Sequence, residues 1–320
     1  MNHFTLTLKL LTVMCLIAVT AAVISSCAKK AVPAGTVNVV VSILPLADMV
    51  RHVGGEYVTV ETIVPLNTSP HVFEPAPREL RLLAKADLLV INGLGLEFWK
   101  DKMVEASANP RLRILDLSQG VERILGDHGH DAVHHGKGHD AGRHVTGHHD
   151  EGQYGNPHIW LSPRIVMTQI DSIRKALTDI DGAHSGIYER NASIYRRELE
   201  ALDREIRDRV KKFREKRFVS HHAAWVYFAR DYGLEQVGVI ETTPGKEPTP
   251  VEIRNIISLL KRINAKAVFT EPQFSPKAAV VIAEECDIMV LTLNNMGFPP
   301  EYDYIDMMRY NTNEIEKALR

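Results

Sequence analysis

The segment SGIYERNASIYRRELEALDREIRDRVKKF, residues 185–213, decides how the chain is organised. It contains no proline and no glycine after Gly186, and a set of apolar residues recurs at helical spacing amid dense Arg and Glu: Ile187, Ile194, Leu199, Leu202, Ile206 and Val210. The pattern predicts one amphipathic helix of roughly 28 residues, or about 42 Å. A coiled coil is the alternative, but a single pass with irregular spacing does not favour it. We expect this helix to join two parts of the protein stiffly.

On both sides of this helix, short β-branched or Leu-rich runs alternate with helical patterns. The runs before it predict strands at 36–44, 58–64, 87–92 and 111–117, with helices such as 77–86 and 97–108. The runs after it predict strands at 217–220, 236–240, 265–270 and 288–293, with helices at 223–231, 249–263, 276–285 and 304–319. This rhythm is typical of mostly parallel sheets. The predicted fold class is α/β, with lobes at 36–182 and 217–320 joined by a connecting helix at 183–216.

The amino terminus predicts export from the cytoplasm. An apolar run from Leu10 to Ile24 would reach only about 22 Å as a helix, short of the roughly 30 Å hydrocarbon core of a membrane. Residues 1–26 therefore indicate a signal peptide. The tetrad ISSC ending at Cys27 resembles a bacterial lipobox, so we expect Cys27 to be lipidated and 27–35 to link the anchor to the fold. An ordinary signal peptide with a coincidental cysteine is the alternative.

Composition limits the class of partner. The 320 residues include 38 Lys and Arg against 40 Asp and Glu, a net charge of −2, which gives no basic surface for nucleic acid. A hydrophobic content of 45% is ordinary for a globular protein, and about 290 mature residues suit two domains. With Cys27 acylated, no internal disulfide is possible, and Cys286 is expected to be a buried thiol.

A histidine-rich segment at 127–150 indicates metal handling. It has almost no apolar residues, so it cannot offset the entropy of ordering and predicts a mobile loop. Neutral imidazole is the commonest metal ligand. A solvated linker without a binding role is the alternative. The eight candidate low-affinity ligands are His128, His130, His134, His135, His139, His144, His148 and His149.

Two short motifs before the long helix each hold one candidate ligand. SPHVFEP at 69–75 fences His71 between prolines, which reduces the freedom of the unfolded loop. NPHIWLSP at 156–163 follows the histidine-rich segment and sets His158 among apolar and aromatic neighbours. These neighbours indicate that the His158 ring is partly buried and therefore has a partner.

The motifs after the long helix follow predicted strands. VSHHAAWVYF at 219–228 places His221 and His222 at the carboxyl end of a strand, where parallel sheets bind ligands. We expect one ring of this pair to point into a crevice and the other to face solvent. TEPQFSP at 270–276 and LNNMG at 293–297 add a carboxylate and two amides at further strand ends.

Taken in this order and spacing, SPHVFEP, NPHIWLSP, HHAAWVYF, TEPQFSP and LNNMG resemble the metal-binding lipoproteins of zinc and manganese ABC importers over essentially the whole mature chain. The resemblance implies two (β/α) lobes with the metal in a cleft between them. It also implies a non-enzymatic monomer that serves an ABC permease and its ATPase. His71 and His158 match the ligands from the first lobe. His222 matches the third, because the family pattern fits HAAWVYF from His222 and not from His221.

The chain departs from this family at two positions. Where the family has an aspartate as fourth ligand, this chain has Asn294, a weaker neutral donor. Asn294 itself, Glu74 or water can complete the set, or Glu271 can supply balancing charge without binding the metal. The family's aspartate before the second histidine is here Asn156, which puts the usual support of that loop in doubt.

The ligand types favour Zn²⁺ over Mn²⁺. Three imidazoles suit a four-coordinate zinc ion, whereas Mn²⁺ prefers the hard oxygen that manganese members place at the His222 position. The predicted function is capture of Zn²⁺ on the outer side of a bacterial membrane, either periplasmic or at the cell surface. Two rivals are a secreted zinc hydrolase, for which no HExxH motif is present, and a surface adhesin, for which no repeats are present.

Overall fold

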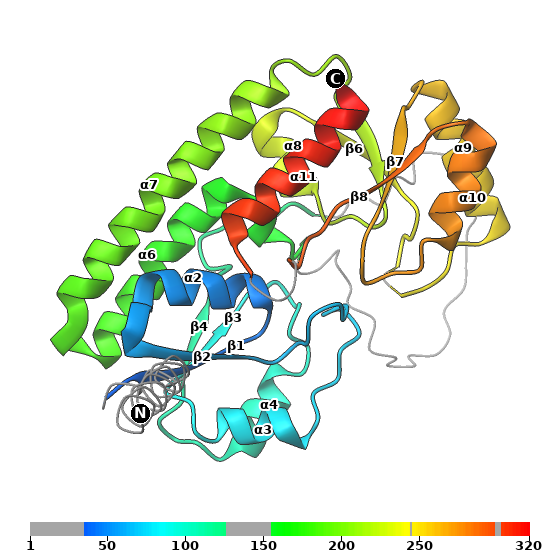
Figure 1. Ribbon diagram of the computed structural model, residues 1–320. Coiled ribbons are helices and arrows are strands. Elements are labelled where there is room, and N and C mark those ends of the chain that lie inside the picture. The colour runs from blue at the N-terminus through cyan, green and yellow to red at the C-terminus, as the bar shows by residue number, and fades with distance from the viewer. Residues whose placement is uncertain (1–34, 126–154, 244, 298–301) are drawn as a thin grey trace, which may run out of the picture. The chain divides into compact units, whose positions relative to one another are not determined.

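A computed structural model describes residues 35–125, 155–243, 245–297 and 302–320. The elements below all belong to one compact unit, residues 37–320. Figure 1 labels them. None of the helices in the described ranges is long and apolar enough to cross a membrane.

The amino-terminal strands form one parallel sheet in the order β2-β1-β3-β4. Its strands are β1 (Val37–Val41), β2 (Val58–Thr62), β3 (Leu88–Ile91) and β4 (Arg113–Asp116). The accompanying helices are α2 (Leu44–Gly54), α3 (Pro77–Leu83) and α4 (Lys100–Ser107), with a short helix η2 (Gly55–Tyr57).

Alternation along the strands separates two apolar layers. In β1, Val39 belongs to the largest core cluster, whereas Val40 belongs to a separate cluster with Leu83 of α3. In β3, Val90 and Leu89 divide in the same way. The sheet is therefore buried on both faces, as its near-continuous apolar strands require, with α2 on one side and α3 and α4 on the other (Figure 1).

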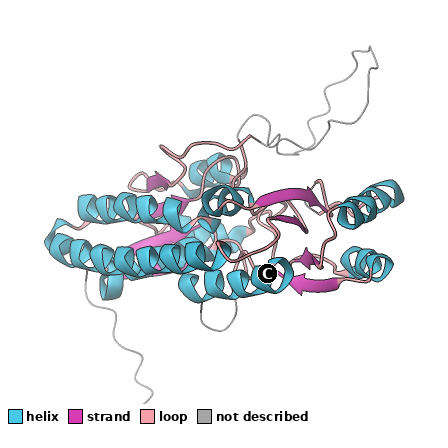
Figure 2. Cartoon of the chain, turned by 90° about the horizontal axis from the view of Figure 1, so that it is seen from above, coloured by secondary structure: helices cyan, strands magenta, loops and turns pink. Residues whose placement is uncertain are grey.

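The carboxyl-terminal strands form two parallel pairs, β5 with β6 and β7 with β8. The strands are β5 (Arg217–Ser220), β6 (Glu235–Val239), β7 (Ala267–Thr270) and β8 (Met289–Thr292). The helices are α8 (Val226–Tyr232), α9 (Pro250–Arg262), α10 (Lys277–Cys286) and α11 (Tyr304–Leu319). Figures 1 and 2 both show these strands between α9 and α10 on one side and the long helices on the other.

The same alternation appears in these strands, and it connects them to the amino-terminal sheet. Phe218 of β5 and Phe269 of β7 belong to the largest core cluster, which also contains Val39. Their neighbours Val219 and Val268 belong to another cluster with side chains of α9 and α10. One continuous apolar core therefore reaches the strands before and after the long helix.

The long helix is α7 (Ser185–Val210), preceded by η4 (Gly182–His184) and α6 (Pro163–Ile180). It packs on α6, α2 and α11, and Tyr195 on its buried face donates from its hydroxyl to Asp48 Oδ2 of α2 at 3.0 Å. Its 26 residues confirm the predicted long helix. It stops before Phe213, and beyond it the amides of Arg214 and Glu215 bond instead to the carbonyl of Leu319.

Two helices lie outside the ranges predicted from the sequence, α2 and α6. Both begin with a proline in the first turn, a position where the missing amide costs nothing. Residues 42–44 were expected to continue the first strand, but β1 ends at Val41 because Pro45 starts a helix there. In α6, the Ser162 side chain accepts from the amide of Ile165 and caps the helix. The division at 36–182, 183–216 and 217–320 stays a prediction.

The central role of α7 in the core gives a stability prediction. Leu202→Ala removes a fully buried side chain from α7 and should lower the free energy of unfolding by about 2–5 kcal/mol. Ile194→Ala on the same helix is the matched control, because Ile194 is 42% exposed, and should change it by less than about 0.5 kcal/mol. Urea denaturation of the metal-free protein measures both, and equal losses would contradict the described packing of α7.

Candidate metal centre

Three separated segments bring histidines together. His71 lies in the loop between β2 and α3, His158 lies directly before the short helix η3 (Ile159–Leu161), and His222 follows β5. His158 and His222 are buried and His71 is half-buried. In the described ranges, they form the one group of three or more His, Cys, Asp or Glu side chains that lie close enough together to hold a metal ion.

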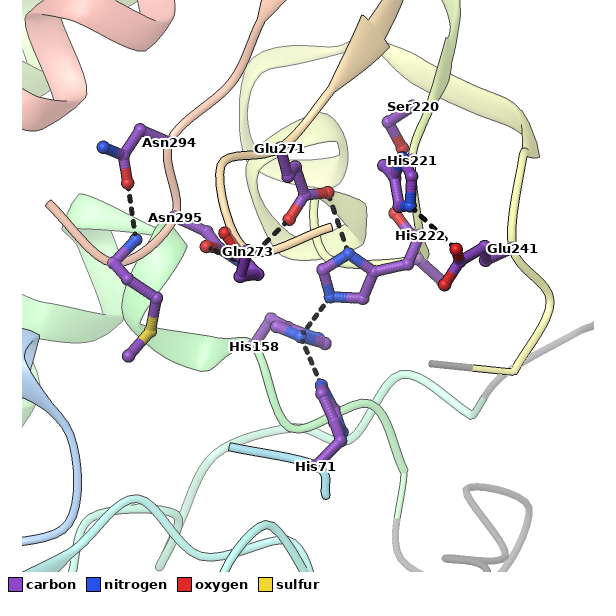
Figure 3. A network of polar contacts seen from close by, with 12 residues as sticks. His71, His158, Ser220, His221, His222, Glu241, Glu271, Gln273, Asn294 and Asn295 are labelled. Atoms are coloured by element: carbon purple, nitrogen blue, oxygen red, sulfur yellow. Dashed lines mark hydrogen bonds and ion pairs between the residues drawn. The ribbon is translucent and has the colours of Figure 1, made fainter. Parts of the chain in front are cut away.

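The three Nε2 atoms face one another (Figure 3). His158 Nε2 lies 3.1 Å from His71 Nε2 and 2.9 Å from His222 Nε2. One nitrogen from each of the three rings lies within 4.8 Å of the others. Ligand nitrogens on a tetrahedral zinc ion are about 3.4 Å apart, given Zn–N bonds of about 2.0–2.1 Å. The three imidazoles therefore fit one face of such a tetrahedron after small adjustments.

Oxygen acceptors hold the far side of two of these rings. His222 Nδ1 lies 2.8 Å from Glu271 Oε1, and His158 Nδ1 lies 2.9 Å from Asn156 Oδ1. A neutral imidazole that donates from Nδ1 to such an oxygen keeps a lone pair on Nε2. The lone pairs of His158 and His222 thus point toward the common centre.

Asn156 supports the His158 loop despite replacing the family's aspartate. Its Oδ1 also accepts from the backbone amide of His158 at 3.0 Å, and its Nδ2 donates to the carbonyl of Ala223 at 2.5 Å. The Asn156 carbonyl accepts from the Tyr227 hydroxyl at 2.9 Å. Asn156 therefore makes the hydrogen bonds that its replacement of the family's aspartate put in doubt. It does not supply the negative charge of an aspartate.

Burial and neighbouring rings keep His158 neutral. Burial lowers the pKa of His158 well below its usual value, and the positive charge that His222 or His71 would carry lowers it further. A metal ion needs the unprotonated ring. His158 is thus in the form that binds metal at neutral pH and somewhat below it.

His221 does not face solvent, contrary to the prediction for one ring of the pair. It is fully buried, its Nε2 lies 3.2 Å from Glu241 Oε1, and its ring stacks on Phe274 at 4.5 Å between centroids. The prediction was wrong because His221 and His222 both follow β5 in the interior of the protein. Side chains that alternate in direction there are buried on either side, so neither ring reaches solvent. His221 is absent from the group of converging nitrogens.

The candidates for a fourth ligand occupy different surroundings. Asn294 Oδ1 accepts from the amides of Met296 at 3.0 Å and Gly297 at 2.8 Å, and Asn294 Nδ2 donates to the Gly297 carbonyl at 2.7 Å. Glu74 is exposed. Glu271 is buried and lies on the Nδ1 side of His222, opposite the shared centre. Neither Glu74 nor Glu271 belongs to the converging group, and both polar atoms of the Asn294 side chain bond within its own turn.

Several supporting residues were not singled out from the sequence. Asn92 at the end of β3 donates from Nδ2 to the Pro157 carbonyl at 2.7 Å, next to His158. Glu97 in turn accepts from the amides of Asn92 at 2.8 Å and Gly93 at 3.0 Å. A buried polar residue directly after an apolar strand was the available signal.

Some predicted sites fall outside the described residues. These are the lipidated Cys27 and the histidine-rich segment with His128, His130, His134, His135, His139, His144, His148 and His149. Cys286 lies inside the described ranges but is half-buried and not buried as expected. Its position at the end of α10 leaves part of the thiol at the surface, and its Sγ lies 3.9 Å from the Ile257 carbonyl.

The fold and the converging imidazoles define an α/β protein with a candidate three-histidine metal centre. The family described as zinc-uptake complex component A, periplasmic, matches residues 39–318. A Treponema pallidum (strain Nichols) protein described as metal-binding is 31% identical over 88% of this chain and 86% of its own length. The zinc-binding lipoprotein AdcA of Streptococcus pneumoniae serotype 4 is 26% identical over 92% of this chain, but the match covers 58% of AdcA.

A solved structure agrees with these matches. The crystal structure of ZnuA has a TM-score of 0.76 and 31% sequence identity, and the match covers 88% of this chain and 99% of that one. The chain belongs to the family of zinc-uptake complex component A.

Support of the His158 loop by Glu97 gives a pH prediction. Burial raises the pKa of Glu97 to about 6, against an ordinary value of 4.5. The folded state thus favours the protonated carboxyl. Its stabilising contribution is present below about pH 4.5 and is lost as the pH rises toward 6, a change of about 2 kcal/mol in the free energy of unfolding.

Glu97→Gln removes this titration. Relative to the variant, the wild-type protein should therefore lose about 2 kcal/mol of stability between about pH 4 and pH 7. Denaturant titrations of both metal-free proteins across this range measure the difference. Parallel stability curves would show that Glu97 is not buried as described.

Proposed function

We propose that the protein captures Zn²⁺ outside the cytoplasm with His71, His158 and His222 and delivers it to an ABC-type permease driven by an ATPase. The observation that carries this proposal is the convergence of three imidazole Nε2 atoms from separate segments. The family is named for zinc uptake and for the periplasm. The protein is therefore a binding component of a transport system and not an enzyme.

Zinc is favoured over manganese by the donors that face the centre. Three neutral nitrogens suit the four-coordinate, borderline-soft Zn²⁺, whereas Mn²⁺ prefers oxygen ligands. The buried carboxylate of Glu271 accepts from the far side of His222. From there it supplies negative charge to the site without being a ligand itself.

We propose that water or another small donor completes the zinc coordination in place of Asn294. Both hydrogen bonds to Asn294 Oδ1 come from backbone amides, so binding a metal would break the turn that they form. Glu74 is exposed, and it belongs to the same loop as His71. Three protein ligands and an exchangeable fourth position suit an ion that must be both held and released.

The segments outside the described residues complete the proposal. Lipidated Cys27 would hold the mature chain, as a monomer, at a bacterial membrane. The eight histidines of 127–150 would bind further Zn²⁺ weakly and raise its concentration near the tight site. Both assignments rest on the sequence, together with the lipoprotein description of AdcA.

Single substitutions test the three-histidine site. His71→Ala, His158→Ala or His222→Ala should each weaken tight Zn²⁺ binding by at least about a hundredfold, because each removes one of three strong donors. Competition with a chromophoric chelator measures the dissociation constant of the tight site.

His221→Ala is the adjacent control. It should keep the Zn²⁺ affinity within a few-fold of the wild type. Since the His221 ring is buried, the melting temperature of the metal-free variant must be recorded with it. If His221→Ala loses tight binding while His222→Ala retains it, the assignment of the third ligand is wrong.

Substitution of Asn294 tests the fourth position. Asn294→Asp keeps both acceptor bonds but replaces the donor that bonds the Gly297 carbonyl. It should therefore lower the melting temperature of the metal-free protein without tightening Zn²⁺ binding. If the residue were a ligand, the added negative charge would tighten binding clearly. Calorimetric titration of the variant separates the two results.

A further inference from the structure

Two residues with amide side chains, Gln273 and Asn295, link Glu271, which contacts the proposed ligand His222, to Trp160, which packs beside the proposed ligand His158. Gln273 Nε2 donates to Glu271 Oε2 at 3.2 Å and to Asn295 Oδ1 at 2.5 Å. The other oxygen of Glu271 accepts from His222. In Figure 3, Glu271 lies between His222 on one side and Gln273 and Asn295 on the other.

The direction of these hydrogen bonds follows from the chemistry of the groups. The Glu271 carboxylate can only accept, so Gln273 must present its NH₂ group to it. The second N–H of the same group then points at Asn295, which must present Oδ1. Both bonds therefore start at the Gln273 NH₂ group and end on oxygens of Asn295 and Glu271, and the carboxylate keeps its other oxygen for His222.

Asn295 also links these hydrogen bonds to Trp160, which lies beside His158. Its backbone carbonyl accepts from Trp160 Nε1 at 2.7 Å, and the Trp160 ring lies 5.1 Å from the His158 ring. The Tyr304 hydroxyl donates to the Trp160 carbonyl at 2.7 Å. The hydrogen bonds behind His222 thus continue through Asn295 to Trp160, whose ring packs beside His158.

The loop that carries Asn295 is built to stay in one conformation. The Asn311 side chain of α11 accepts from the Asn294 amide and donates to the Asn294 carbonyl, both at 2.7 Å. Gly297 has φ +99°, and a Cβ there would lie 1.9 Å from the Tyr302 ring, so only glycine fits. Asn294 Oδ1 closes the turn at 294–297 by accepting from the amides of Met296 and Gly297. The loop therefore offers Asn295 at a fixed position.

We propose that Gln273 is a positioning residue for zinc binding, which acts through Glu271 on His222 and is itself fixed by Asn295. In this chain, the loop at 293–297 supports the ligands from behind. The inference rests on the proposed function, because it requires His222 to bind Zn²⁺. Without Gln273, Glu271 loses the donor that orients it, and the acceptor that fixes the His222 ring is then held less firmly. Loss of such outer contacts typically lowers metal affinity roughly 10- to 100-fold.

A double-mutant cycle on the mature protein tests whether Gln273 acts through Glu271. Gln273→Met and Glu271→Gln should each weaken Zn²⁺ binding roughly 10-fold or more in chelator competition. The double variant should bind no more weakly than Glu271→Gln alone, since Gln273 then has no carboxylate to orient. Relative to the wild-type protein, the absorption bands of bound Co²⁺ should shift in the same direction in Gln273→Met and in Glu271→Gln.

Gln169→Met is the matched control. Gln169 is also buried, and it donates to the Leu117 carbonyl at 3.3 Å and not to Glu271. This variant should bind Zn²⁺ like the wild type, and the melting temperature of each metal-free variant should be recorded to exclude a loss of fold.

The outcomes are distinct. Additive losses in the double variant, or wild-type affinity in Gln273→Met, would overturn the role of Gln273 and leave the three-histidine site intact. Absence of a tight site in the wild-type protein would overturn the proposed function, and the role of Gln273 with it.

Discussion

The proposed site depends on three imidazole nitrogens that are held close together. Each ring must stay neutral, so that its Nε2 keeps a lone pair for the metal. Nε2 atoms at 2.9 and 3.1 Å cannot all carry protons, because protonated rings at this separation repel one another. Burial of His158 and the oxygen acceptors behind His158 and His222 keep the lone pairs directed at the centre. The fold must therefore supply specific partners to rings that come from distant parts of the sequence.

The shared core provides that precision. The strands before and after α7 contribute to one apolar cluster, which α2, α6, α7 and α11 cover together. His158 lies where the two sets of strands are cross-linked, through Asn92 on one side and through Asn156 and Trp160 on the other. By contrast, His71 lies in a loop without regular structure and is the least buried of the three. His158 and His222 thus form the fixed part of the site.

The sequence predicted the elements, and the histidines that come together, better than the contacts around them. Periodicity identified α7 and most strands, because amphipathic patterns follow directly from burial, and the motifs singled out His71, His158 and His222, whose ring nitrogens converge in the structure. The surroundings depend on tertiary contacts that no spacing encodes. The buried His221 ring and the turn closed by Asn294 could not be read from neighbouring residues. Nor did the sequence reveal that Asn156 can replace an aspartate, since this depends on Ala223 and Tyr227 from beyond α7.

The central claim is that three imidazoles bind one zinc ion. Zinc K-edge X-ray absorption of the mature protein, loaded with less than one equivalent so that the tightest site fills first, tests it most directly. The account predicts three imidazole nitrogens at about 2.0–2.1 Å and one further nitrogen or oxygen neighbour. The same spectrum should appear when residues 127–150 are deleted. Two or fewer imidazoles in the deletion variant, or an oxygen-dominated shell, would contradict the account.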